Sequence, residues 1–551
     1  MVEKKGYKIL IVDDEVEYQK VLTLILSELG YGVASCSNGI EALDYLEKNV
    51  VDLVLTDLKM PAMDGAELIQ KIREKNEKID IIVITAYGSI ESAVNAIKYG
   101  AKDYFVKSSN MNELEMKVGR LAKIHRLERK MEKRYYSYVG IYTFTYSAIG
   151  MLLPLLGQYL AAIGFSGVKI GIVTATATAV GIGASPFWGY RSHHSKDSVR
   201  IVIFLCVITT LIIIGLMFVK QYVIFLLAFA CFSFFQTPIM PLTDAMTLEN
   251  RIPFGAVRKW GALGFAAGVF IAGQLAEATS LVIIFPLCAF GYTVAWIIMV
   301  RLQRGKKRSE LGFLTILESE QHKGLEEPPD LNKPRKPAVA MEPRRGDYLV
   351  LFRNKKLMAL LISAFFICGT NVANNTYFGF LYIDVGGSIA GIGVAFLLMC
   401  GGEAPFMAWT ERLERLIPME RMILISMMIS ALRYLWYSTG PAPELLIGTF
   451  FIQGMVNGIV LVEFVRYVVK LVEPAMIGMA LTLYQALSSN CSTILCQLIG
   501  GTILDFYSAT QVYLFFSIYN GIGILLYLGF GLYKCSETNV KKRDHDKSKK
   551  V

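Results

Sequence analysis

The sequence predicts two fold classes in one chain. A doubly wound α/β domain with five parallel strands is followed by an all-α bundle of twelve transmembrane helices, arranged as six plus six. Short apolar runs alternate with amphipathic segments near the N-terminus, and twelve longer apolar runs follow. Hydrophobic residues make up 54% of the 551 residues and charged residues only 19%, which is too apolar for an ordinary soluble protein.

The first repeat of the α/β domain lies at residues 8–29. The run KILIV is a short apolar stretch that ends in Asp13 and Asp14, and apolar residues at helical spacing follow it. This is the pattern of a buried parallel strand leading into a helix. The same unit recurs, with further strands predicted at 31–35, 51–57, 79–85 and 103–107. Five such repeats predict a doubly wound sheet.

Polar residues gather where these strands end: Asp13, Asp14, Asp57, Thr85 and Lys107. Ligands of such sheets bind beyond the carboxyl ends of the strands, so one pocket is expected there. Three crowded carboxylates repel one another unless a hard cation separates them, and oxygen ligands favour Mg²⁺. One of the carboxylates is then able to attack a phosphoryl donor.

The motifs VDDE, TDLKMPAMDG, ITAYGS and DYFVK resemble the response-regulator receiver family, in its nitrogen-regulator-like branch, over residues 7–124. The resemblance implies Asp57 as the phosphoacceptor, with Asp13 and Asp14 as the acids that hold Mg²⁺ beside it. It also implies a two-component phosphorelay, with a sensor histidine kinase or a phosphotransfer protein as partner. The only catalysis expected is the domain's own phosphorylation and dephosphorylation, so the protein is not predicted to be an enzyme.

The resemblance assigns the switch as well. Lys107 pairs with the phosphoryl group, while Thr85 and Tyr104 form a pair in which the hydroxyl moves to the phosphate and the ring follows it inward. Such a change is a local packing event driven by charge. Neither an ATPase nor a DNA-binding helix-turn-helix follows, so no gene-regulatory output is expected. A charged helical segment leads instead towards the membrane, either as a mechanical link or as a passive tether with a basic anchor.

The twelve apolar segments each approach the roughly 20 residues that a helix needs to cross the hydrocarbon layer. They lie at 135–161, 169–190, 200–219, 221–244, 256–278, 280–300, 355–383, 388–409, 420–438, 444–468, 475–500 and 510–533. Lys and Arg concentrate in alternate loops and in the tail, which places both termini and the first domain in the cytoplasm of a bacterial cell, at the plasma membrane. The net charge of +10 is explained by these anchors, and nucleic acid is not expected as a partner.

Domain limits follow from these segments. We predict a receiver domain, a helical linker, two six-helix halves separated by a cytoplasmic loop, and a basic tail. Their ranges are 1–124, 125–134, 135–300, 301–354, 355–533 and 534–551 respectively.

This six-plus-six plan resembles the major facilitator superfamily. The stretches PLTDAMTLENRIPFGAVRKWGALGF and GGEAPFMAW are similar to the lactose permease group of sugar and nucleoside proton symporters. The resemblance implies that Asp244 and Arg258 hydrogen-bond substrate hydroxyls, that Phe265 stacks on the sugar, and that Glu403 binds hydroxyls from the other half. A polar solute that loses water on entering the membrane needs such charged partners.

Several polar positions of this group are changed in the sequence, which affects the expected coupling. In ALRYLWYS, Arg433 would balance a proton-carrying acid, while Glu463 either carries the proton or is neutralised by Arg466. The group's coupling histidine is replaced by Asn457, and two of its acidic positions by Asn371 and Asn374, which are assigned to the substrate site. Because asparagine carries no proton, either Glu403, Asp244 or Glu463 does so, or coupling is altered or absent.

The leading hypothesis is a secondary transporter of a small polar solute, a sugar, glycoside or nucleoside, that is coupled to an ion or proton and regulated by phosphorylation of Asp57. In a second hypothesis the transporter-like body senses a solute within a two-component pathway. A third is that neighbouring genes have been joined. No cofactor other than Mg²⁺ is expected.

Overall fold

The chain forms two compact units, Met1–Lys133 and Arg134–Val551, in a computed structural model of the protein. The structure describes residues 6–86, 94, 97–195, 197–250, 252–321 and 350–534, with the main chain alone at 130, 305–321, 411 and 475. Most of the predicted loop 301–354 and all but the first residue of the predicted tail lie outside the described residues.

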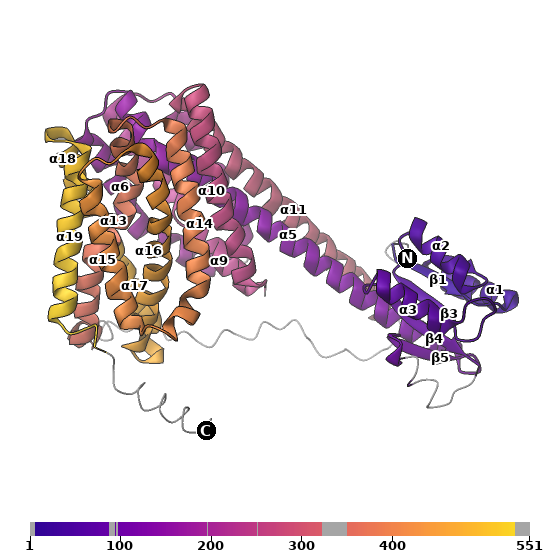
Figure 1. Ribbon diagram of the computed structural model, residues 1–551. Helices are drawn as coiled ribbons and strands as arrows, with labels where there is room; N and C mark the ends of the chain where they lie inside the picture. Colours follow the sequence, from indigo (N-terminus) through magenta and orange to yellow (C-terminus); the bar gives the residue numbers. More distant parts are fainter. Residues whose placement is uncertain are drawn as a thin grey trace, which may run out of the picture. The chain divides into compact units, whose positions relative to one another are not determined.

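The first unit contains a five-stranded parallel sheet with the order β2-β1-β3-β4-β5 (Figure 1). The strands are β1 (Lys8–Val12), β2 (Gly32–Cys36), β3 (Leu53–Asp57), β4 (Asp80–Thr85) and β5 (Asp103–Val106). The prediction of five parallel strands is confirmed. Strands β3 and β4 are buried along their whole length, which explains why their sequences are continuous apolar runs.

Helices cover both faces of this sheet. They are α1 (Val16–Glu28), α2 (Gly39–Lys48), α3 (Gly65–Lys75) and the first part of α5 (Met111–Ala162). Alternate strand residues point to opposite faces: Val54 packs in the core under α2 and α3, and Leu55 packs in the core under α1 and α5. Side-chain caps at Asn38 and Asp64 start α2 and α3, because each accepts a hydrogen bond from the amide three residues later.

The second unit is a bundle of helices that run side by side (Figure 1). Its N-terminal half holds the remainder of α5, α6 (Gly167–His193), α7 (Ser198–Leu216), α8 (Tyr222–Gln236), α9 (Ile239–Glu249), α10 (Phe254–Ala278), η1 (Leu281–Ile283) and α11 (Ile284–Gln321). Its C-terminal half holds α13 (Lys355–Asp384), α14 (Ile389–Glu414), α15 (Met419–Tyr437), α16 (Pro443–Lys470), η2 (Pro474–Met476), α17 (Ile477–Tyr484), η3 (Gln485–Cys491), α18 (Ser492–Phe506) and α19 (Ala509–Gly529).

All twelve predicted segments are helical, and among the described residues 11 helical spans are long and apolar enough to cross a membrane. The segment outside this set is α15, which carries Glu420, Arg421 and Arg433 within 19 residues. Two segments differ from single helices. The span 221–244 is divided between α8 and α9 near Pro238, and the span 475–500 contains the π-helix η3.

The two halves meet through α6 against α18 and through α10 against α14. Close backbone approach at the first pair depends on glycine, since a Cβ on Gly167 would lie 2.6 Å from the carbonyl oxygen of Gly501. Carboxylates at two helix ends also join the halves. Asp505 accepts hydrogen bonds from the amides of Gly167 and Val168, and Glu277 accepts one from Ala390 at 2.6 Å. We call Asp505 and Glu277 the carboxylate caps.

Candidate functional site

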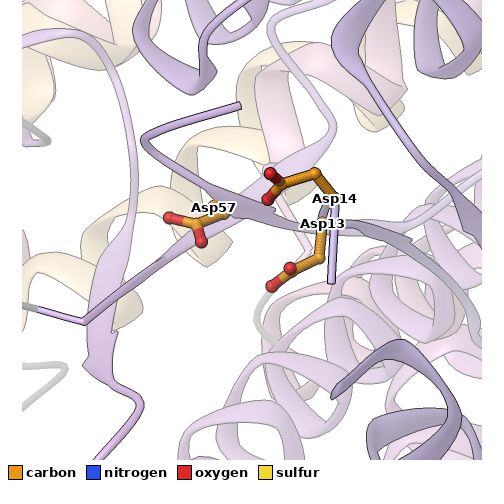
Figure 2. Close-up of side chains that lie close together, drawn as sticks. All are labelled: Asp13, Asp14 and Asp57. Carbon is orange, nitrogen blue, oxygen red and sulfur yellow. The ribbon is translucent and has the colours of Figure 1, made fainter. Parts of the chain in front are cut away.

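Three carboxylates meet at the carboxyl ends of β1 and β3. Asp13 and Asp14 follow β1 directly, Asp57 is the last residue of β3, and one oxygen of each lies within 4.8 Å of the others (Figure 2). Asp13 and Asp57 are buried, whereas Asp14 is exposed. The structure therefore brings together the three acids that the sequence assigns to one pocket.

Lys107 closes this pocket from the end of β5. Its Nζ lies 2.7 Å from Asp57 Oδ2 and 2.9 Å from Asp13 Oδ2. Burial lowers the pKa of the Lys107 ammonium, but the interactions with the two aspartates outweigh it and raise that pKa above its ordinary value. Burial also raises the pKa of the Asp13 carboxyl, which the hydrogen bond from Lys107 only partly offsets. One lysine thus compensates part of the charge of three acids.

The loop after β3 is shaped by Gly65, the first residue of α3. A Cβ at this position would collide with the main-chain carbonyl oxygen of Asp57, so the helix can begin this close to Asp57 only with glycine. Gly65 also donates its amide hydrogen to Leu58 O at 2.9 Å. Ala62, in the same loop, has a φ of 69°, a conformation that is rare for residues other than glycine.

The donor set of this pocket fits a hard divalent cation. Asp13, Asp14 and Asp57 supply only oxygen ligands, and the three together carry more negative charge than Lys107 balances. Mg²⁺ held by these residues would neutralise charge on an incoming phosphoryl group. The protein's own part is to hold the Asp57 carboxylate beside Lys107 and near the other two acids.

The predicted switch residues lie on neighbouring strands. Thr85 is the last residue of β4 and is buried. Tyr104 on β5 pairs in register with Val83, which precedes Thr85 by two residues on β4. The Tyr104 ring packs partly buried against the core, with Lys117 Nζ 5.0 Å from its centroid.

The second unit, Arg134–Val551, contains a cluster of charged and phenolic groups in its N-terminal half. Arg258 Nη1 on α10 lies 2.6 Å from Asp244 Oδ2 on α9, and the Tyr142 hydroxyl on α5 donates to Asp244 Oδ1 at 2.6 Å. Tyr146 stacks beside Tyr142, with ring centroids 6.1 Å apart. Asp244 is thus bonded from two helices and has little freedom to move. We call Asp244, Arg258, Tyr142 and Tyr146 the N-half cluster.

Glu403 on α14 lies within electrostatic reach of Arg258 and Tyr146, and its helix packs against α10, which carries Arg258. Close packing of α16 fixes the main chain here, because a Cβ on Gly458 would lie 2.7 Å from the carbonyl oxygen of Glu403. Phe265 follows Arg258 by seven residues on α10, so the two lie on the same side of that helix. The structure thus pairs Asp244 with Arg258, with Glu403 within electrostatic reach of Arg258 and Phe265 two turns along α10.

A second polar network lies inside the C-terminal half around Arg433. This buried guanidinium donates to Gln453 and to the Tyr437 hydroxyl, and its carbon lies 4.5 Å from the centroid of Tyr434. Asn457 joins the network by accepting a hydrogen bond from Gln453 at 2.9 Å. Among the described residues, the hydrogen-bond partners of Arg433 are therefore neutral, whereas the sequence assigns Arg433 to balancing an acid.

The remaining predicted residues fall into two places. Asn371 accepts from the Tyr434 hydroxyl at 3.2 Å, and the buried Asn374 accepts from Tyr513 at 2.8 Å, so both belong to the network around Arg433. Glu463 is fully buried and lies 3.3 Å from Arg466, its neighbour on α16. Ten residues of helix separate Glu463 from Gln453, or about 15 Å, so Glu463 is remote from Arg433's contacts on α16.

Sequence reasoning missed Tyr142, Tyr146 and Gln453. The two tyrosines continue a spacing of four that begins at Tyr138, which is an unusual polar stripe in an apolar segment. Gln453 gave no such signal, since an isolated glutamine in an apolar run has no periodicity to reveal its partner.

Comparison with known proteins assigns both units. Residues 9–119 match the response regulator receiver domain family, and residues 135–515 match the family described as MFS_1 like family. The maltose permease of Geobacillus stearothermophilus is 30% identical over 392 residues, which are 70% of this chain and 92% of that protein. An uncharacterized transporter of Bacillus subtilis, YwbF, is 28% identical over 74% of this chain and 95% of its own length.

Two further similarities concern single units. The transcriptional regulatory protein ZraR of Klebsiella oxytoca is 40% identical over 108 residues, 20% of this chain and 24% of that protein. The crystal structure of the nucleoside transporter NupG covers 73% of this chain and 99% of its own, at a TM-score of 0.59 and 15% identity, and so supports the transporter fold alone.

The similarity to the maltose permease and the family match over residues 135–515 both assign the second unit to a family of transporters. The chain belongs to the MFS_1 like family, as a multi-pass membrane transporter preceded by a response regulator receiver domain.

Proposed function

We propose that the protein is a secondary transporter of a small polar solute, a sugar, glycoside or nucleoside, whose activity is set by phosphorylation of Asp57. Similarity to a maltose permease supports a sugar or glycoside, and the fold shared with a nucleoside transporter supports transport as such. We further propose that the protein resides in a bacterial plasma membrane with both termini in the cytoplasm, where a sensor histidine kinase or a phosphotransfer protein supplies the phosphoryl group.

The observation that carries the transport proposal is the packing of α10 against α14, which brings Glu403 within electrostatic reach of Arg258 in the N-half cluster. The cluster offers a carboxylate, a guanidinium and two hydroxyls from one half, and Glu403 offers a second carboxylate from the other. A polyhydroxylated solute bound between them would exchange its water for charged hydrogen-bond partners. Because the partners come from both halves, movement of one half against the other would release the solute.

Asp57 is the proposed phosphoacceptor because it lies at the end of β3 with Lys107 beside it and with Asp13 and Asp14 within the same pocket. Mg²⁺ is the proposed cation. Phosphorylation would replace the ion pair of Lys107 and Asp57 by one to the phosphoryl group, and Thr85 and Tyr104 would carry the change to the face of β4 and β5.

Coupling to protons is proposed to depend on Glu403 or Asp244, since the network around Arg433 shows neutral partners. That same neutrality favours a second candidate function, in which the body binds a solute without coupled flux and acts as a sensor.

The test measures uptake of radiolabelled maltose and of a nucleoside into proteoliposomes containing the full chain, with and without acetyl phosphate and Mg²⁺. We expect uptake to respond to acetyl phosphate in the wild type, to lose that response in Asp57→Asn, and to fall at least tenfold in Glu403→Gln. Asp44→Asn, on the exposed side of α2, is the matched receiver control. Binding of solute without uptake in any condition would favour the sensor, and wild-type uptake by Glu403→Gln would remove that residue from the site.

A further inference from the structure

The receiver unit contains a second cavity, at the edge of the sheet opposite the acid pocket. It has a volume of about 510 Å³ and is lined entirely by residues of the first unit. Tyr7 and Tyr31, which immediately precede β1 and β2, form one wall, and the stretch of α5 from Gly119 to Lys133 forms the other. We call this the basic cavity.

Its lining is strongly cationic. Lys123, Arg126, Arg129 and Lys133 contribute four positive charges, His125 adds an imidazole, and no acidic residue is among the lining residues that the structure describes. The size falls within the roughly 300–1,000 Å³ typical of small-molecule sites. A ligand that fits this lining carries negative charge and several hydrogen-bond acceptors, which is the chemistry of a phosphate group.

Asp52, the residue before β3, holds Arg129 and His125 of the cavity wall in place. This buried carboxylate accepts from Arg129 at 2.9 Å and from the Lys8 amide at 2.8 Å, and lies 3.2 Å from His125 Nε2. Tyr7 packs edge-on to the His125 ring, with centroids 5.5 Å apart. The cavity is therefore a built feature of the domain: Asp52 pairs with Arg129, and Lys123 and Arg126 line the cavity beside it.

The cavity is separate from the phosphorylation chemistry. Its residues stand at the beginnings of the strands, whereas Asp13 and Asp57 stand at their ends. The five residues of β1 span about 17 Å at the usual rise of a strand. A ligand in the basic cavity would leave Asp57 open to a phosphodonor.

We propose that the basic cavity binds the phosphate-bearing headgroup of an anionic phospholipid. The position of the cavity in the chain favours a lipid over a soluble phosphate compound. Its last lining residue, Lys133, precedes by two residues the apolar segment that begins at 135, and basic residues next to a membrane span contribute about 1 kcal/mol each to the attraction of anionic lipids. This proposal depends on the membrane assignment and not on which solute is transported.

The first test removes charge. Full-length protein in a neutral detergent is titrated with dihexanoyl phosphatidylglycerol, and hydrogen exchange at Tyr7, Tyr31 and residues 119–129 reports binding at the cavity. We expect Lys123→Gln with Arg126→Gln to weaken binding roughly 30-fold, which corresponds to two basic residues. Lys20→Gln with Lys78→Gln, two exposed lysines outside the cavity, is the matched control and should bind like the wild type.

The second test removes the cavity and keeps its charge. A Cβ on Gly119 meets no atom within 4 Å, so a larger side chain there is accommodated by the fold and extends into the cavity. Gly119→Phe should abolish the lipid-dependent protection, and Gly119→Ala should retain it. Equal binding by Gly119→Phe and the wild type would show that basic residues attract lipid without a site and would overturn the proposal.

The source of the phosphate is tested by replacing the lipid with inorganic phosphate, with ATP, or with dihexanoyl phosphatidylcholine. We expect none of them to protect the cavity at concentrations at which phosphatidylglycerol saturates it. Stronger protection by inorganic phosphate or ATP would identify a soluble ligand, and protection by phosphatidylcholine would exclude recognition of net negative charge. Either result would overturn the lipid assignment.

Discussion

Asp13 is under opposing influences in the receiver pocket. Its carboxylate is buried, it shares Lys107 with Asp57, and burial raises its pKa. A carboxyl whose pKa is raised by folding contributes stability below its ordinary pKa, and that contribution is lost as the pH rises through the folded-state value. At neutral pH without a divalent cation, the ionised Asp13 therefore lowers the free energy of unfolding of the receiver.

The first prediction is that Asp13→Asn stabilises the metal-free receiver at neutral pH by about 0.5–2 kcal/mol, the gain usual for a single stabilising substitution. The gain should shrink as the pH falls towards the ordinary pKa of aspartate, because the wild-type carboxyl then becomes protonated. Hydrogen exchange of β3 and β4 amides in the full-length protein with EDTA measures this. Mg²⁺ at 100 times its Kd should raise the free energy of unfolding of the wild-type receiver by about 2.7 kcal/mol, and that of Asp13→Asn far less. Equal Mg²⁺ responses would place the metal elsewhere.

Helix α3 begins against the main chain of Asp57, and Gly65 permits that approach. We predict that Gly65→Ala destabilises the receiver by about 2 kcal/mol or more and slows labelling of Asp57 by acetyl phosphate, because the loop must move to admit a methyl group. Gly119→Ala provides a contrast at an open position of α5, where the same change should stabilise the helix by about 0.5–1 kcal/mol. Thermal unfolding and a labelling time course measure both. Normal labelling of Gly65→Ala would show that the loop yields without disturbing the site.

The carboxylate caps act between elements of the two membrane halves. Asp505, at the end of α18, holds the first amides of α6, and Glu277, at the end of α10, holds the Ala390 amide of α14. A hydrogen bond to a charged group contributes about 1.5–3 kcal/mol, and a carboxylate also interacts favourably with a helix N-terminus. These bonds favour closure of the bundle at the end where α5 finishes and α6 begins.

We predict that Asp505→Asn speeds hydrogen exchange of the Gly167 and Val168 amides about tenfold, and that it also speeds exchange at the distant Ala390. The second effect follows if the halves separate as rigid bodies, because opening at one contact then opens the other. Glu277→Gln should give the reciprocal result. An effect of Asp505→Asn confined to α6 would mean that the helix end frays locally while the halves stay together.

At the scale of the whole molecule, sequence patterns predicted the elements well and their pairings poorly. Runs of apolar residues reveal the ends of strands and the membrane segments. The receiver pocket could therefore be placed from the sequence, because its acids and Lys107 end or directly follow a strand. Its domain limits stay a prediction, although the unit boundary at Lys133 and the family match from 135 lie close to them.

Contacts across the membrane bundle could not be read in the same way. Thr174 bonds Gln497, 323 residues later, and no periodicity links them. The π-helix η3 and the start of α18 give another example: Ser488 on η3 donates to the Leu361 carbonyl on α13 at 2.8 Å, and Ser492 on α18 donates to that of Phe365. Such hydrogen bonds from serine depend on which helix packs alongside. The apolar composition of the segments does not distinguish one neighbouring helix from another.

The carboxylate caps also relate the two halves to each other. Each half supplies one acid at the end of its fifth crossing, and that acid binds an amide at the start of the second crossing of the other half. Exchanging the two halves therefore exchanges the two bonds, as happens with the paired contacts of a twofold-symmetric dimer.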